Sequence, residues 1–178
     1  PEAPLTEIDG AENNPLCADS NDGSIELNII GGVDPYNYLW SNGDETNIPA
    51  DLPADDYTCT ITDANGCTLI SSTTTLTAPP SIELSSEQIE NEMEGDGTGS
   101  VSIAATGGTA PLSYSWSNGF DTPTINDLSA GEYSCTVSDA NGCMTIFGPF
   151  LVENLINTTS LQNGSFQLYP IQVAMLSI

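Results

Sequence analysis

The chain repeats itself at a fixed offset of 76 residues, and this internal repeat constrains the fold more than any other feature. Residues 31–70 align with residues 107–146 without a gap, and 21 of the 40 positions are identical. Repetition at a fixed period indicates that one structural unit is built twice. A period of this length is too long for one solenoid turn but long enough for a small all-β domain with its own core.

Within each copy, polar and apolar residues alternate with a period of two. Residues 24–29 and 57–62 of the first copy show this alternation, as do residues 100–104 and 133–137 of the second. Such alternation predicts half-buried strands. Asn-Gly and Gly-Gly pairs between the segments supply the positive φ angles that tight turns need. We therefore predict an all-β fold of two tandem immunoglobulin-like β-sandwich repeats.

The offset also predicts the domain boundaries. We assign residues 14–78 to the first β-sandwich repeat and residues 90–152 to the second. Residues 79–89, which begin with two prolines, would link them. Residues 1–13 would form an extended N-terminal segment and residues 153–178 a C-terminal segment.

Each copy contains a Trp followed by a Tyr-x-Cys motif. In immunoglobulin-like sandwiches a buried Trp packs against a Cys, with a Tyr two residues before that Cys. We therefore assign Trp40, Tyr57, Trp116 and Tyr133 to the two cores. The alternative is that both Trp side chains are exposed and stack on carbohydrate, which would suit a carbohydrate-binding module.

The spacing from Gly-Gly through Trp-Ser-Asn-Gly to Asp-Ala-Asn-Gly-Cys is kept twice. This block resembles the SprB repeat of large secreted surface adhesins of gliding Bacteroidota, whose modules are immunoglobulin-like or PKD-like. Residues 163–178, NGSFQLYPIQVAMLSI, are similar to the opening of the C-terminal sorting domain of type IX secretion substrates. Ile171-Gln172 stand where that family has Asn-Pro. Both resemblances imply an exported protein at the cell surface, and we expect the chain to be part of a longer precursor.

The chain has 25 acidic residues and no Lys, Arg or His, so its formal net charge is −25. Nucleic acid is excluded as a partner because no cation can meet its phosphates, and we expect no membrane insertion. His-based catalytic triads and Lys nucleophiles are absent for the same reason. We interpret the paired carboxylates as solvated loop charges, and we predict that the protein is not an enzyme.

Five cysteines in an exported chain leave at least one thiol free or paired between chains. Repeat symmetry favours Cys59–Cys67 and Cys135–Cys143. A hairpin there would separate the first pair by about 13 Å, whereas a disulfide requires Cα atoms within about 7 Å. Our preferred pairing is therefore Cys17–Cys67, with Cys59–Cys67 as the alternative. Cys59 and Cys135 would then be core thiols.

Two acidic loops are candidates for binding Ca²⁺, which prefers several oxygen ligands on a flexible loop. The candidate ligands are Asp19, Asn21, Asp22, Glu94 and Asp96. Neither loop has the EF-hand order of ligands, so the alternative is that both are plain turns.

These observations favour a structural or adhesive surface protein, a subunit of a cell-surface fibre or filament. We expect subunits to associate when a terminal segment adds as a strand to a sheet edge of a neighbour. Surface polysaccharide is a further candidate partner. The alternative function is a carbohydrate-binding or spacer module of a secreted enzyme.

Overall fold

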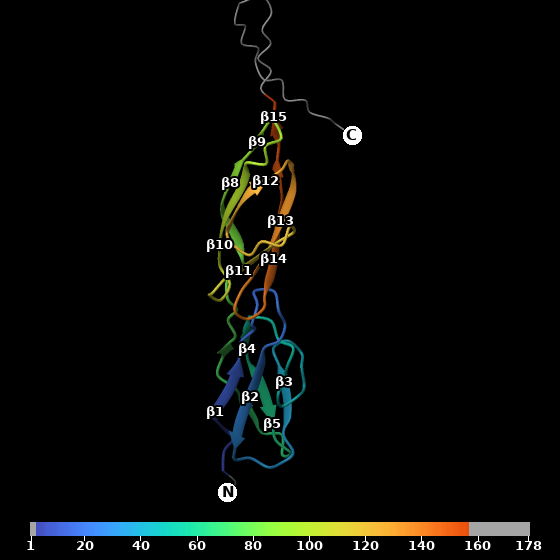
Figure 1. Ribbon diagram of the computed structural model, residues 1–178. Coiled ribbons are helices and arrows are strands. Elements are labelled where there is room, and N and C mark those ends of the chain that lie inside the picture. The colour runs from blue at the N-terminus through green and yellow to red at the C-terminus, as the bar shows by residue number, and fades with distance from the viewer. Residues whose placement is uncertain (1–2, 157–178) are drawn as a thin grey trace, which may run out of the picture. The chain divides into compact units, whose positions relative to one another are not determined.

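The computed structural model describes residues 3–156, which form strands and turns with no helix in that range (Figure 1). Residues 163–178, which are similar to a sorting domain, lie outside the described residues. The strands that precede residue 79 are β1 (Thr6–Asn13), β2 (Ser24–Ile30), β3 (Asn37–Trp40), β4 (Asp56–Tyr57), β5 (Cys59–Thr62), β6 (Thr68–Ile70) and β7 (Thr74–Thr75). Those that follow are β8 (Glu83–Glu90), β9 (Glu92–Met93), β10 (Gly99–Thr106), β11 (Ser113–Trp116), β12 (Thr124–Leu128), β13 (Gly131–Ser138), β14 (Met144–Val152) and β15 (Asn154–Leu155).

The described residues fall into two compact units. The first unit contains residues 3–83, 105–113 and 137–145, and the second contains residues 84–104, 114–136 and 146–156. The strands before residue 79 form the sheets β1-β2, β3-β5-β6 and β4-β7, and the strands after it form β12-β10-β8, β11-β13-β14 and β15-β9. Strand β8, in the segment that we expected to be a linker, and β15, in the expected C-terminal segment, are thus paired within sheets of the second sandwich. Both repeats are immunoglobulin-like β-sandwiches, as the alternating pattern predicts.

In the first repeat, β3, β5 and β6 form an antiparallel sheet in which Trp40 is aligned with Cys59. Strand β1 pairs with β2 and has a bulge between Ile8 and Ala11. Gly10 lies in that bulge, where an added Cβ would be 2.3 Å from the Glu26 carbonyl oxygen. Only glycine fits such a close approach of two strands. Thus β1, in the segment that we expected to be an N-terminal extension, is hydrogen-bonded into the sandwich.

The core of the first repeat is built from the apolar half of each alternating strand. Its members are Ile25, Leu27, Trp40, Leu52, Tyr57, Cys59, Ile61 and Leu76. The polar atoms of the two large aromatic residues are satisfied within the fold. Trp40 Nε1 donates to the Thr46 carbonyl at 2.9 Å, and Tyr57 Oη donates to the Pro53 carbonyl at 2.9 Å.

The core of the second repeat repeats this plan with one addition. Trp116 Nε1 donates to the Thr122 carbonyl at 2.8 Å, and its ring lies 5.7 Å from that of Phe150. Tyr133 Oη donates to the Ser129 carbonyl at 2.8 Å, but the Tyr133 ring is only partly buried. Tyr133 therefore differs from Tyr57, which is buried.

Candidate functional site

Both predicted calcium loops are turns in which a carboxylate accepts hydrogen bonds from its own loop. Asp22 Oδ1 accepts from the Leu16 N–H at 3.1 Å and from the Ser20 hydroxyl. Asp96 Oδ1 accepts from the Thr98 N–H at 3.1 Å and the Thr98 hydroxyl at 2.7 Å. The hydroxyl bonds from Ser20 and Thr98 are the main reason that the pKa of each carboxyl lies below its usual value.

The other three candidate ligands do not complete a metal site. Asp19, Asn21 and Glu94 are exposed, and Glu94 has a φ of 54°. Within residues 3–156 no three acidic or thiol side chains come together in an arrangement that could hold a metal ion. Both loops are hydrogen-bonded turns in this structure, and calcium binding by either of them stays a prediction.

The disulfide joins Cys17 to Cys143, with Cα atoms 5.6 Å apart, and both cysteines belong to the first unit. This pairing corrects our preferred assignment of Cys17–Cys67 and its alternative Cys59–Cys67. Cys67 is an exposed free thiol, whereas Cys59 and Cys135 are buried free thiols. Burial raises the pKa of both core thiols. The pairing Cys59–Cys67 fails because Cys59 is buried in the core while Cys67 is exposed. The pairing Cys17–Cys67 fails because the fold brings Cys17 to Cys143 instead.

Each repeat has an Asp-Ala-Asn-Gly-Cys turn that ends in a cysteine. The aspartate of the turn accepts hydrogen bonds from the backbone of the residues that follow it. In the first repeat, Asp63 Oδ1 accepts from the Asn65 N–H at 3.0 Å and the Cys67 N–H at 2.8 Å. Asp63 Oδ2 accepts from the Val33 N–H at 3.2 Å. The side chain is buried, and the N–H of Gly66 donates to the Asp63 carbonyl at 3.0 Å.

The second repeat builds the same turn around Asp139. Its Oδ1 accepts from the N–H groups of Asn141 and Cys143, both at 2.9 Å. Its Oδ2 accepts from the Thr109 N–H at 2.8 Å. The Thr109 bond is the main reason that the pKa of Asp139 lies below its usual value. We had assigned no role to these aspartates, although the repeated motif contained the signal, since Asp commonly accepts backbone bonds within a turn.

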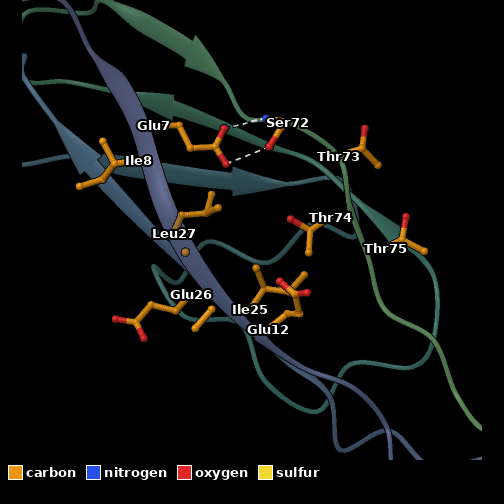
Figure 2. Close-up of a pocket in the computed structure, with 12 residues that line it drawn as sticks. Glu7, Ile8, Glu12, Ile25, Glu26, Leu27, Ser72, Thr73, Thr74 and Thr75 are labelled. Atoms are coloured by element: carbon orange, nitrogen blue, oxygen red, sulfur yellow. Dashed lines mark hydrogen bonds between the residues drawn. The ribbon is translucent and has the colours of Figure 1, made fainter.

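A groove of about 510 Å³ lies in the first unit between β1 and residues 72–75 (Figure 2). Glu7 of β1 reaches across it, and its carboxylate accepts from the Ser72 N–H at 2.7 Å and the Ser72 hydroxyl at 3.1 Å. In the described residues β1 pairs only with β2, and β7 only with β4. The groove therefore separates β1 from residues 72–75, and the Glu7 side chain joins the two there in place of a backbone ladder.

The outward face of the β3-β5-β6 sheet carries no charge. Its two rows are Asn37, Thr62 and Thr68, and Leu39, Thr60 and Ile70. Leu39 is 54% exposed and Ile70 is 70% exposed. In a chain with 25 acidic residues and no basic residue, these six residues form a surface without a carboxylate.

The two Trp side chains offer no platform for stacking on carbohydrate. Trp40 is 2% exposed and Trp116 is 3% exposed, because both indole rings fill the sandwich cores. A platform for carbohydrate needs an aromatic ring whose face is exposed to solvent. Trp40 and Trp116 do not provide one.

The family comparison finds the same family in both copies of the internal repeat. The model of the SprB repeat family matches residues 11–45 and 94–120, once in each copy. The comparison with curated proteins found no match. No helix in residues 3–156 is long and apolar enough to cross a membrane.

The comparison with solved structures gives weak similarities to an outer capsid protein and to immunoglobulin domains. The three N-terminal domains of the highly immunogenic outer capsid protein (Hoc) of bacteriophage RB49 have a TM-score of 0.42 at 14% identity, covering 86% of this chain and 59% of that one. Immunoglobulin domains 1–5 of Sidekick-1 have a TM-score of 0.40 at 14% identity, covering 87% and 40%. The chain thus spans less than two thirds of either structure.

Proposed function

We propose that this chain, which carries SprB repeats, is an extracellular adhesive module that serves as a subunit of a cell-surface fibre or filament. The SprB matches support a surface location and an adhesive role. The absence of Lys and His from the whole sequence supports a non-catalytic role, because Schiff-base and His-dependent chemistry are unavailable.

The observation that carries the filament proposal is the groove between β1 and residues 72–75. It is bounded by two strands that lack a backbone partner on the groove side within the described residues. Such edges accept an extended segment by β-augmentation, in which backbone hydrogen bonds provide affinity. We propose that a terminal segment of a neighbouring subunit adds as a strand there.

Net charge favours this mode of association over side-by-side packing of acidic surfaces. Two chains with a net charge of −25 each repel one another. Backbone hydrogen bonds do not depend on net charge, and the uncharged face of β3-β5-β6 provides a further contact that adds no carboxylate. Surface polysaccharide remains a proposed partner, with the threonine hydroxyls of that face as hydrogen-bonding groups.

Blocking the groove edge tests the proposal. Thr73 lines the groove and is exposed, and it lies outside the β4-β7 ladder, which begins at Thr74. Thr73→Pro removes that N–H, so we expect the variant to sediment as a smaller species than the wild-type polymer. Thr73→Ala keeps the N–H and should assemble like the wild type.

The unfolding midpoint of each variant shows whether the sandwich is intact, so that loss of assembly is not confused with loss of fold. Two outcomes contradict the proposal: a wild-type chain that stays monomeric at micromolar concentration, or a folded Thr73→Pro variant that polymerises as well as Thr73→Ala.

A further inference from the structure

We infer that Cys67 is a covalent docking site, which forms a disulfide with a cysteine of another SprB-type repeat at the position that Cys17 occupies in the first repeat. The inference rests on the disulfide that this chain already contains. It does not depend on strand addition at the groove.

The internal repeat supplies a direct comparison for Cys67. Cys67 and Cys143 are equivalent by the 76-residue offset, and each ends an Asp-Ala-Asn-Gly-Cys turn. The cysteine N–H donates to the turn aspartate at 2.8 Å in the first repeat and 2.9 Å in the second. Gly66 and Gly142 have φ angles of 83° and 86°. Two turns of the same sequence and geometry therefore present the same thiol.

The cysteine of one of these two turns is already bonded. Cys143 is bonded to Cys17, and Asn141 Nδ2 donates to the Leu16 carbonyl at 2.9 Å, one residue before the bonded cysteine. Asn141 of the turn thus binds the Leu16 carbonyl, and Cys143 of the turn forms a disulfide with the next residue, Cys17. The turn of the first repeat has the same amino acids, and its Cys67 is an exposed free thiol.

The partner cannot come from the remaining cysteines of this chain. Cys59 and Cys135 are buried in the cores, and Cys17 is already bonded. The position that corresponds to Cys17 in the second repeat holds Met93, which cannot form a disulfide. A Cys17-type thiol must therefore belong to a further repeat, either elsewhere in the same polypeptide or in another subunit.

The chemistry is an ordinary two-electron oxidation. The Cys67 thiolate displaces a thiolate from a disulfide oxidant to form a mixed disulfide, and the Cys17-type thiolate of the partner then displaces the second. The S–S bond between the two repeats forms, the S–S bond of the oxidant breaks, and the oxidant leaves as two thiols. The oxidising environments that exported proteins enter supply such disulfide oxidants.

Thiol mapping of the protein purified from the cells that make it tests the inference. Free thiols are alkylated under denaturing conditions, disulfides are then reduced, and the released thiols are alkylated with a second, heavier reagent. We expect Cys67 and Cys143 to carry the heavier label and Cys59 and Cys135 the lighter one. The isolated recombinant chain should carry the lighter label on Cys67.

Unreduced peptide mapping identifies the partner. The expected cross-link joins the Cys67 peptide to a peptide whose cysteine aligns with Cys17. If reductant releases a separate chain on a denaturing gel, the partner is another subunit, whereas an unchanged chain mass places it in the same polypeptide. Cys67→Ser should remove this cross-link, while Cys143→Ser, the matched control, should leave it in place.

A free Cys67 in the native material would overturn the inference. A disulfide of Cys67 to a small thiol, to a second Cys67 or to an unrelated sequence would overturn it equally. Strand addition is separable because it should persist in reductant and be lost in Thr73→Pro, whereas the cross-link should be lost in reductant.

Discussion

Glu92 is a buried carboxylate that has no cation to pair with, and its oxygens are satisfied by the backbone. It accepts from the Gly97 N–H at 2.9 Å and from the Ala130 N–H at 2.8 Å. Its own N–H donates to the Glu153 carbonyl at 3.0 Å, where β9 pairs in parallel with β15. Backbone donors here replace the salt bridge that a chain with basic residues could have used.

Truncating Glu92 should therefore destabilise the second repeat. Glu92→Ala leaves two N–H groups without their acceptor, and we expect a loss of about 1–3 kcal/mol in the free energy of unfolding. Glu90→Ala is the control, because Glu90 is exposed and its change should stay within about 0.5 kcal/mol. Urea unfolding measures both, and equal effects would contradict the role given to Glu92.

Asp139 makes stability depend on pH in the acidic range. Its pKa is depressed in the folded state, chiefly by the Thr109 N–H bond, from a usual value of 3.8. The contribution to stability is therefore present above pH 3.8 and is lost as the pH falls through the depressed folded pKa. Asp139→Asn removes this titration, so the urea midpoint of the variant should fall less steeply with pH below 3.8. If the urea midpoint of Asp139→Asn falls with pH as steeply as that of the wild type, the role given to Asp139 is contradicted.

At the scale of elements, the Cys17–Cys143 disulfide links positions that are 126 residues apart in sequence. A cross-link of this kind restricts the unfolded chain and typically contributes about 2–4 kcal/mol. We expect the double variant Cys17→Ser and Cys143→Ser to have a free energy of unfolding lower by that amount, and therefore to unfold at a lower denaturant concentration. Cys67→Ser should unfold like the wild type, since Cys67 is exposed and free in this chain. Equal midpoints for the double variant and the wild type would contradict the expectation.

At the scale of the whole molecule, charge repulsion governs association. The net charge of −25 acts over a Debye length of about 30 Å at 0.01 M salt and about 8 Å at 0.15 M. Raising NaCl over this range should therefore increase the sedimenting fraction. Sucrose at the same osmolality, which does not screen charge, should have a smaller effect. Assembly that weakens as NaCl rises would show that attraction between charges, and not strand addition, holds the subunits together.

Much of the fold could be predicted from the sequence because the relevant signals are local. Alternation with a period of two indicates which side of a strand is buried, and the Trp and Tyr-x-Cys motif indicates which residues enter the core. Trp40, Tyr57 and Trp116 are buried, with their polar atoms bonded to nearby carbonyls. The SprB resemblance could also be read from the motif, and the family model matches each copy.

The sites depend on distances that a linear pattern does not contain. Disulfide pairing requires two Cα atoms to meet, so only the folded chain shows that Cys17 faces Cys143 and that Cys67 remains exposed. The same holds for buried Glu92, whose carboxylate accepts a hydrogen bond from the N–H of Ala130, 38 residues away. The sequence by itself therefore determined the all-β class, the repetition and the absence of basic residues, because composition and periodicity are local. The tertiary structure alone decided the cysteine pairing, the groove edges and the burial of Glu92, because these depend on contacts between segments far apart in the chain.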